Sequence, residues 1–216
     1  MKACLALVVL ALQASCAPCL SQTNSSSFYL QAGTNFANGD YKAAILNLTK
    51  ALESDPRNAT NFYARAYCEY FLGDCRSASA DYSRAIEINP KCGSYYCGRG
   101  QCKFYLGDSG GALTDYNKAI ELDPACAMAY FNRGNLRVHV YTNLTAAITD
   151  FDKALELHTD PREDDIFFCR GNAKADLKDF VGAIADYNKA LQINPNYALV
   201  RTNLAIARDA LRASKK

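Results

Sequence analysis

The sequence predicts an all-α fold built from stacked helical hairpins, and three observations lead to this class. First, the segment AIEINP and its variants end at Pro56, Pro90, Pro124, near Pro161 and at Pro195, which places the first three about 34 residues apart, a period typical of repeated supersecondary units. Second, the apolar residues within each unit fall at helical spacing twice. Third, a turn separates the two helical stretches. Each unit is therefore a helical hairpin.

The composition is that of a folded chain. Of its 216 residues, 50% are hydrophobic and 21% are charged, enough apolar material to bury a sizeable core. A formal net charge of +2 argues against a dominant nucleic-acid-binding face, which is usually strongly basic. Ten cysteines are many for a cytosolic protein and ordinary for a secreted one. The composition therefore favours a secreted or lumenal protein.

The N-terminus has the layout of a signal peptide. One lysine, an apolar run over Ala3–Leu12 and a group of small residues follow one another, and the run is too short to span a bilayer. We expect residues 1–16 to be the signal peptide, with cleavage before Ala17, although a cut after Ser21 is also consistent with the pattern. Residues 17–24 then form a polar tail.

A bacterial lipoprotein is the alternative interpretation of this segment, because Cys16 follows two small residues, Ala14 and Ser15. Gln13 departs from the lipoprotein pattern, since an aliphatic or small residue is expected at its position. A bacterial periplasmic or envelope assembly factor is therefore kept as an alternative function, and the periplasm or envelope as the second compartment.

The turns inside the hairpins carry helix stop and start signals. They read NGD from Asn38, LGD from Leu72 and Leu106, and LKD from Leu177. Glycine just after a helix and aspartate at the start of the next are the expected signals, and the closing proline prevents the second helix from continuing. The fourth unit departs from this pattern, because its turn reads VYTNLT and we expect its local geometry to change.

Large and small residues recur at matching positions of the hairpins. The first helices carry large residues, followed four positions later by small ones: Phe28, Phe62, Tyr96, Tyr130 and Phe167, then Ala32, Ala66, Gly100, Gly134 and Gly171. The second helices repeat a small, large, small pattern that begins at Ala44, Ala78, Ala112, Ala147 and Ala183. Small residues let the helices approach closely, while the large ones fill the space beside them.

This pattern resembles the tetratricopeptide repeat family. The resemblance implies a right-handed α-solenoid with a capping helix. Its expected segments are five repeats and a closing region: 25–58, 59–92, 93–126, 127–161 and 164–197, then the capping helix and basic tail, 198–216.

Two charged positions also recur. Arginine occupies one position of the first helix and aspartate one position of the second, in four repeats: Arg65, Arg99, Arg133 and Arg170, with Asp81, Asp115, Asp150 and Asp186. In the first repeat both positions are neutral, Gln31 and Asn47, which suggests that the two positions touch. Because the pair recurs four times, we interpret it as a partly buried structural ladder and not as a catalytic acid and base.

In this family the first helices line a concave groove that holds an extended peptide or a partner's helix. Carried over position by position, the resemblance implies a groove lined by aromatic residues, with amides in the later repeats: Tyr29, Phe36, Tyr63, Tyr67, Tyr70, Phe71, Cys97, Gln101, Phe104, Tyr105, Phe131, Asn135, Phe168 and Asn172. Aromatic anchors suit an apolar or aromatic-rich ligand, and amides can pair with a peptide backbone. We expect about half of these side chains to be exposed.

The charges of this groove exclude the subtype that grips acidic chaperone C-termini with lysine, arginine and asparagine. The matching positions here hold Tyr29, Gly33, Tyr63 and Tyr67. The resemblance thus implies a non-catalytic scaffold for a protein or peptide partner, with no cofactor, metal, nucleic acid or membrane span.

The cysteines are expected to brace the repeats. Equivalent first helices lie roughly 8–10 Å apart, beyond the reach of a disulfide, so Cys68–Cys102 and Cys92–Cys126 are disfavoured. Cys75–Cys102 and Cys97–Cys126 are the candidate bridges. Zinc is disfavoured by the spacing of Cys92, Cys97 and Cys102. Buried free thiols are the alternative, and a thiol-active folding factor that uses Cys97 is the alternative function.

Four glycosylation sequons are present. Asn143 and Asn58 lie in or beside turns and Asn24 lies in the polar tail, so these three are the candidate glycan sites, whereas Asn47 occupies the ladder position and is expected to be too enclosed.

Overall fold

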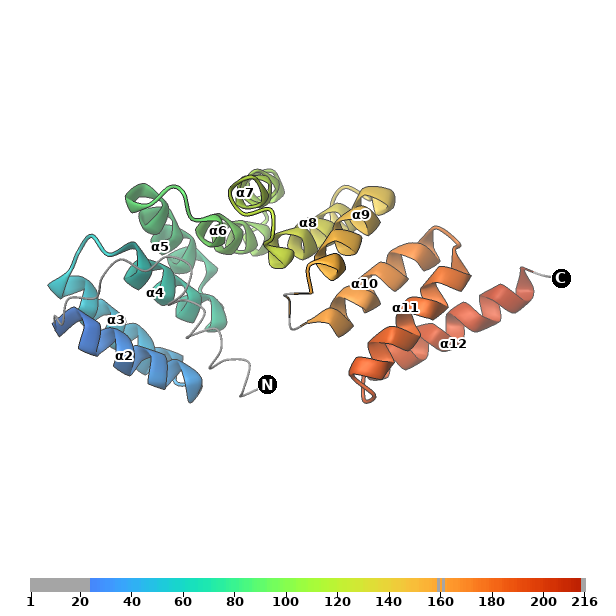
Figure 1. The fold of residues 1–216 in the computed structure, drawn as a ribbon, viewed down its shortest axis with the longest axis horizontal. Coiled ribbons are helices and arrows are strands. Elements are labelled where there is room, and N and C mark those ends of the chain that lie inside the picture. Colours follow the sequence, from blue (N-terminus) through green and yellow to red (C-terminus); the bar gives the residue numbers. More distant parts are fainter. Residues whose placement is uncertain (1–23, 159, 161, 215–216) are drawn as a thin grey trace. The chain divides into compact units, whose positions relative to one another are not determined.

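The computed structural model describes residues 24–158, 160 and 162–214, and each regular element in this part of the chain is an α-helix (Figure 1). The chain divides into two compact units, residues 1–123 and 124–216. The predicted signal peptide, residues 1–16, and most of the predicted tail lie outside the described residues. The all-α tetratricopeptide-type fold predicted from the sequence is confirmed.

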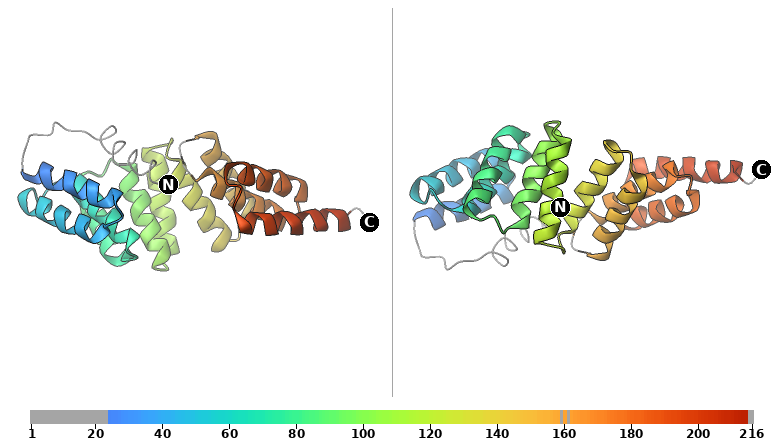
Figure 2. Two further views of the ribbon diagram at one scale, coloured as in Figure 1. Left: turned by 90° about the horizontal axis from the view of Figure 1, so that it is seen from below. Right: turned by 90° about the horizontal axis from the view of Figure 1, so that it is seen from above.

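Unit 1 contains three helical hairpins. Its helices are α2 (Asn24–Ala37), α3 (Tyr41–Ser54), α4 (Ala59–Phe71), α5 (Cys75–Ile88), α6 (Gly93–Tyr105) and α7 (Ser109–Leu122). Each helix contacts the next along the chain, and α4 also contacts α6. Figures 1 and 2 show these helices following one another in sequence order. The hairpins therefore stack in the order of the sequence.

Unit 2 contains two hairpins and a closing helix. Its helices are α8 (Ala127–His139), α9 (Leu144–Glu156), α10 (Glu163–Asp176), α11 (Phe180–Ile193) and α12 (Ala198–Ala213). Consecutive helices are again in contact, and α10 also touches α8 and α12. Helix α10 thus lies between the first helix of the preceding repeat and the closing helix.

The predicted stop and start signals act as expected. Gly73 ends the α4 turn at φ +81°, a left-handed conformation that costs glycine little. The carboxylate of Asp74 then accepts a hydrogen bond from the backbone N–H of Ser77 at 3.0 Å and caps α5. In the last repeat Lys178 occupies the glycine position at φ +64°, and in the fourth repeat Asn143 replaces the capping aspartate.

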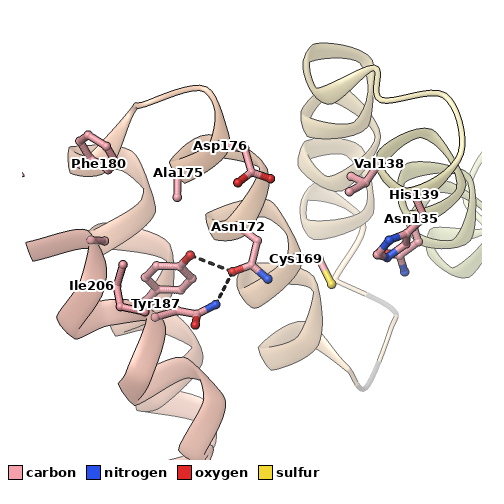
Figure 3. A pocket seen from close by; sticks show the side chains of 12 residues that line it. Asn135, Val138, His139, Cys169, Asn172, Ala175, Asp176, Phe180, Tyr187 and Ile206 are labelled. Atoms are coloured by element: carbon pink, nitrogen blue, oxygen red, sulfur yellow. Dashed lines mark hydrogen bonds between the residues drawn. The ribbon is translucent and has the colours of Figure 1, made fainter. Parts of the chain in front are cut away.

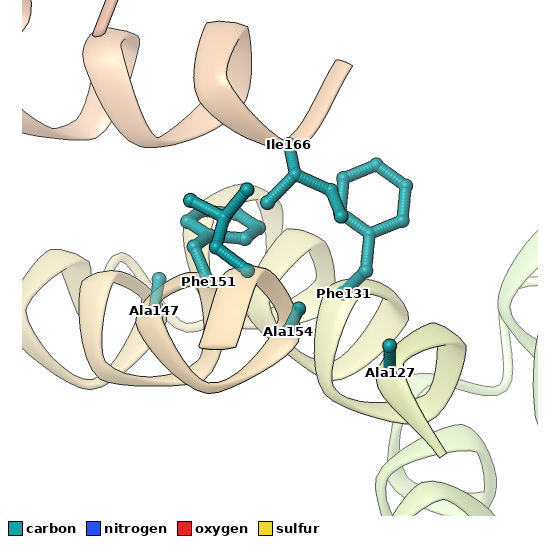
Figure 4. Close-up of a cluster of buried hydrophobic side chains, with 7 residues drawn as sticks. Ala127, Phe131, Ala147, Phe151, Ala154 and Ile166 are labelled. Atoms are coloured by element: carbon teal, nitrogen blue, oxygen red, sulfur yellow. The ribbon is translucent and has the colours of Figure 1, made fainter. Parts of the chain in front are cut away.

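Small residues are required at the positions of a first helix against which the aromatic rings of the second helix pack. In unit 2, Phe151 is fully buried and packs in one cluster with Phe131 and Ile166, between α8, α9 and α10 (Figure 4). A Cβ atom added to Gly134 would lie 2.7 Å from the Cε1 atom of Phe151. The small residue predicted at this position is therefore needed by the ring opposite it.

The predicted ladder of ion pairs is present in four repeats. Arg99 is representative: its Nε and Nη2 donate to the two carboxylate oxygens of Asp115 at 2.9 and 2.8 Å, and its Nη1 donates to the Ser83 hydroxyl of the preceding repeat at 3.3 Å. The other pairs have the same fork geometry: Arg65–Asp81, Arg133–Asp150 and Arg170–Asp186. The ladder links neighbouring hairpins as well as the two helices of one hairpin.

The first repeat forms its amide pair with a different position of its first helix. Asn47 does not pair with the position of Gln31; its Nδ2 donates to Oδ1 of Asn35 at 2.9 Å, and Gln31 is exposed. Asn35 lies four residues after Gln31 and therefore projects from nearly the same face of α2.

Candidate peptide-binding groove

Unit 2 contains a cavity of about 480 Å³ at the surface formed by its first helices (Figure 3). Its wall comes from α8, α10, α11 and α12. The lining residues are Asn135, Val138, His139, Cys169, Asn172, Ala175, Asp176, Phe180, Tyr187, Asn203, Ile206 and Ala207. This volume lies in the range of ligand sites in proteins, and the wall mixes apolar groups with a few amides.

Asn172 is held in one orientation at the centre of this wall. Its Oδ1 accepts a hydrogen bond from the hydroxyl of Tyr187 and another from Nδ2 of Asn203, both at 2.8 Å (Figure 3). Burial raises the pKa of Tyr187 to about 12, so its hydroxyl keeps its proton at neutral pH. Both donors thus direct the oxygen of Asn172 toward themselves and leave its NH₂ group for another partner.

Two amides of the cavity lack partners within the protein. Among the residues that the structure describes, no hydrogen bond uses Nδ2 of Asn172 or any atom of the Asn135 amide. Both residues are half-buried and line the same cavity from neighbouring first helices. Half-buried amides without partners can exchange hydrogen bonds with the N–H and C=O groups of an extended chain.

The apolar part of the wall would contact side chains of such a ligand. Ile206 of α12 is 62% exposed although it lines the cavity, and Phe180, Val138 and Ala175 complete the apolar surface. A large aliphatic side chain that remains exposed beside unpartnered amides is typical of a binding surface.

Unit 1 presents a cluster of aromatic rings instead of amides. Phe71 is its centre: its ring centroid lies 5.0 Å from that of Tyr67, 5.2 Å from that of Tyr41 and 5.6 Å from that of Phe36. Phe71 is 44% exposed, whereas Phe36 is buried beneath it. These contacts build an aromatic surface across α2, α3 and α4 that is rigid underneath and exposed on top.

The aromatic cluster extends to α6. The ring centroids of Tyr70 and Tyr105 lie 5.9 Å apart, and Phe104 packs edge-on against Tyr105, which is 64% exposed. Leu72 and Leu106, the residues after α4 and α6, are also exposed. The ends of the first helices of unit 1 therefore carry a continuous apolar surface.

The predicted groove residues divide by exposure. Phe71 and Tyr105 are exposed, whereas Phe36, Cys97 and Phe131 are buried. The remaining predicted residues are half-buried: Tyr29, Tyr63, Tyr67, Tyr70, Gln101, Phe104, Asn135, Phe168 and Asn172. Of the whole set, the structure brings Asn135 and Asn172 into the unit 2 cavity.

Sequence reasoning missed the other half of the cavity wall. Tyr187, Phe180, Asn203 and Ile206 come from a second helix and from the closing helix, whereas only first helices were assigned to the groove. Asn203 lies on the helix after the last repeat, where α12 takes the place of a sixth first helix. A comparison of α12 with the preceding first helices would have indicated Ile206, which follows Pro195 at the same distance as Asn135 follows Pro124.

The candidate disulfide Cys75–Cys102 has its two residues in one cluster. Cys75 packs against the buried cluster that contains Cys102, and both residues are free thiols in the structure, so this bridge stays a prediction. Burial raises the pKa of the Cys102 thiol to about 12. The residues of the second candidate, Cys97–Cys126, belong to different units, and this bridge stays a prediction. Cys97 itself is 3% exposed, which disfavours its use as a reactive thiol.

The candidate glycosylation sites differ in access. Asn143 is exposed, and its Oδ1 caps α9 by accepting from the N–H of Ala146 at 3.1 Å, which leaves its Nδ2 free for a glycan. Asn58 is half-buried, and its Nδ2 donates to Asp55 at 3.0 Å. Asn24 is the first residue of α2, and its side chain lies outside the described part of the structure. Asn143 is therefore the most accessible of the described sequons.

The described residues hold neither a metal-type cluster nor a helix suited to a bilayer. Within them, no group of three or more histidine, cysteine, aspartate or glutamate side chains is arranged to hold a metal ion. Among the described helices, none has both the length and the apolar composition needed to cross a membrane.

Comparison with models of known protein families assigns this chain to a family. Models described as tetratricopeptide repeat match residues 29–91 and 165–197, and a model described as TPR repeat matches residues 100–138. The chain belongs to the tetratricopeptide repeat family. Proteins of this family bind protein partners, and the tetratricopeptide chain is accordingly a protein-interaction scaffold. Among curated proteins, no significant match was found.

Solved structures show the same fold. A thermophilic TPR protein of Thermus thermophilus, TTC0263, is 20% identical with a TM-score of 0.69, over 85% of this chain and 98% of that chain. Cut9 in the APC/C hetero-tetramer Cut9–Hcn1 is 18% identical with a TM-score of 0.80, over 98% of this chain and 40% of that chain. YrrB, a TPR protein with an unusual peptide-binding site, is 22% identical with a TM-score of 0.59, over 88% of this chain and 91% of that chain.

Proposed function

We propose that this tetratricopeptide chain is a non-catalytic scaffold that binds an extended segment of a partner protein along its first helices. The observation that carries the proposal is the pair of amides without partners, Asn135 and Asn172, in one cavity of unit 2. The amide donors and acceptors match the N–H and C=O groups of a peptide backbone, and the neighbouring Ile206 would contact a side chain of the same peptide. The fold that the chain shares with YrrB, which has a peptide-binding site, supports the same proposal.

The partner segment is expected to carry apolar or aromatic side chains. The exposed apolar residues at the ends of the first helices of unit 1 are Phe71, Leu72, Tyr105 and Leu106, and they suit apolar side chains of a partner. Aromatic anchors on a binding surface gain affinity by removing apolar area from water. A partner with aromatic residues at intervals would use this surface and the unit 2 cavity independently.

Peptide display tests the proposal and does not require the partner to be identified first. Random peptides are selected on the full chain, and the affinity of a selected peptide is measured by calorimetry. We expect Asn172→Ala to weaken the affinity roughly 5- to 10-fold, about what the loss of one or two hydrogen bonds removes. Gln192→Ala, an exposed amide of α11 outside the cavity, is the matched control and should leave the affinity unchanged. Equal affinities for the wild type and Asn172→Ala would contradict the proposal.

We further propose that the scaffold works in the secretory pathway or outside the cell, after removal of residues 1–16. The ten cysteines and the exposed sequon at Asn143 support this compartment. There, Cys75 and Cys102 would each lose a proton and an electron to a disulfide donor, which is reduced to two thiols while the Cys75–Cys102 bond forms. This bridge would connect the second repeat to the third.

The intact mass of the natively produced protein tests this second proposal. The expected protein lacks the first sixteen residues, carries a mass that a glycosidase removes, and gains alkylation sites after reduction. Replacement of Cys75 by serine should remove one pair of these hidden thiols. A protein that retains residues 1–16 and has every thiol accessible to alkylation when unfolded without reductant would contradict the compartment assignment.

A further inference from the structure

The ladder contains a second cation in three repeats and a carboxylate in its place in the second repeat. The ladder aspartate of each later repeat binds a second base four residues after its arginine: Lys103 on Asp115 at 2.9 Å, Arg137 on Asp150 at 2.7 Å and Lys174 on Asp186 at 2.9 Å. The matching residue of the second repeat is Glu69, four residues after Arg65. The spacing puts Glu69 on the same face of α4, beside Asp81.

The carboxylate of Glu69 is not compensated by the groups around it. Its Oε2 is buried and accepts no hydrogen bond within the described residues. The guanidinium of Arg65, whose charge acts on Glu69, already donates to both oxygens of Asp81 at 2.6 and 3.0 Å and to Thr49 at 3.2 Å. A buried acceptor without a donor destabilises a fold, and the cost is larger when the acceptor is charged.

The groups that face Glu69 come from its own helix and its neighbours. Helix α4 contributes Arg65 and Cys68, the turn contributes Asp74, α5 contributes Asp81, and α6 contributes Cys102. From α3 the contribution is the neutral hydroxyl of Thr49, which binds Arg65. Carboxylates thus outnumber the cations in this cluster, and the thiols are neutral at physiological pH.

Burial and, second, the charge of Asp81 raise the pKa of Glu69 to about 7, whereas Arg65 lowers it by a smaller amount. In an unfolded chain the same carboxyl has a pKa near 4.5. The folded state therefore binds the proton more tightly than the unfolded state. The resulting stabilisation is fully present below about pH 4.5 and is lost as the pH rises through about 7.

We propose that Glu69 makes the second repeat a proton-sensitive joint, in which protonation of this side chain stabilises the packing of α4 on α5 and deprotonation loosens it. The proton takes the role that Lys103, Arg137 and Lys174 have in the later repeats, because it removes the negative charge beside the ladder aspartate. Helix α4 also carries Tyr67 and Phe71 of the aromatic cluster, so the joint and that surface share one helix. The proposal does not depend on the partner or on the cellular compartment.

Urea unfolding of the full chain at pH 5.5 and pH 8 tests the joint. If Glu69 has a pKa of about 7 in the folded chain and 4.5 in the unfolded chain, the unfolding constant should rise by about 27-fold from pH 5.5 to pH 8. Because the Glu69 side chain is half-exposed, solvent screening reduces the expected rise to roughly 3- to 10-fold. Glu69→Gln removes this increment and leaves the pH dependence of all other groups. Glu87→Gln, at an exposed carboxylate of α5, is the control that should keep it.

Glu69→Lys provides the converse test. It places a cation beside Asp81, as Lys103 lies beside Asp115, and should make the chain more stable than the wild type at pH 8. The rise of the unfolding constant that Glu69 causes between pH 5.5 and pH 8 should be absent in this variant. A ¹³C titration of the Glu69 carboxyl in the wild type should give a midpoint near 7. A midpoint below about 5, or a Glu69→Gln chain with the full pH dependence of the wild type, would overturn the proposal.

Discussion

Removal of one ladder aspartate is the perturbation with the most definite consequence. The side chain of Asp115 is 3% exposed and accepts a forked pair of hydrogen bonds from Arg99 and an ion pair from Lys103. The change Asp115→Ala leaves both cations without their common counter-ion. It also breaks the connection from α7 to α6 that the carboxylate makes.

The size of the destabilisation depends on how much water reaches Arg99 and Lys103. Breaking a fully buried ion pair by removing one partner costs about 3–5 kcal/mol. Arg99 and Lys103 are 20% and 25% exposed, so water can solvate part of their charge once Asp115 is gone. We therefore expect Asp115→Ala to lower the free energy of unfolding by about 2–3 kcal/mol, or Tm by roughly 4–10 °C for a chain of this size.

Urea unfolding of the single and double variants measures this effect. The double-mutant cycle of Arg99→Ala and Asp115→Ala should give a coupling energy of about 1–3 kcal/mol. The cycle of Arg84 and Glu87, a pair with side chains 66% and 61% exposed, is the matched control and should give less than about 0.5 kcal/mol. If the two cycles gave equal coupling energies, the argument that burial makes the ladder structural would be refuted.

Three other predictions concern single positions. Lys178→Gly should raise Tm by roughly 2–4 °C, because glycine adopts the φ of +64° without steric cost, and an unchanged Tm would contradict this. Gly134→Ala should destabilise the chain by about 1–3 kcal/mol, because the added methyl group collides with Phe151. Gly110→Ala is the control: its Cβ meets nothing within 4 Å, and it should stabilise the chain by up to about 1 kcal/mol. Denaturant unfolding that ranks the two variants in the opposite order would refute this packing argument. Burial raises the pKa of Cys169 to about 12, so its alkylation at pH 8 should be at least ~100-fold slower than that of a free thiol, as mass spectrometry of the folded protein would show.

The helices and turns were predictable because their signals are local. Gly73 and Asp74 mark a helix end and the next helix start by their own conformational and hydrogen-bonding preferences, without help from distant residues. The pairing of Arg99 with Asp115 was predictable for a different reason: the same two positions carry opposite charges in four repeats, and repetition makes a tertiary contact visible in one sequence.

The groove was less predictable, because the exposure of a ring depends on its neighbours. Phe36 and Phe71 both fit the aromatic pattern of the first helices, yet Phe36 is covered by the rings of Tyr41 and Tyr67, while Phe71 lies on top. Asn203 was missed because the closing helix has no partner helix and was treated as a cap. Side-chain burial and the packing of the last helix are tertiary properties that a repeat pattern does not contain.

Site-specific photocrosslinking tests the central claim, binding along the first helices, most directly. A benzophenone amino acid is introduced at Ile206, which lines the unit 2 cavity, and separately at Val181, which is equally exposed at 64% on α11 but outside the cavity wall. A peptide selected by display should crosslink from position 206 and not from position 181. Equal crosslinking from both positions, or crosslinking from position 181 alone, would contradict the account.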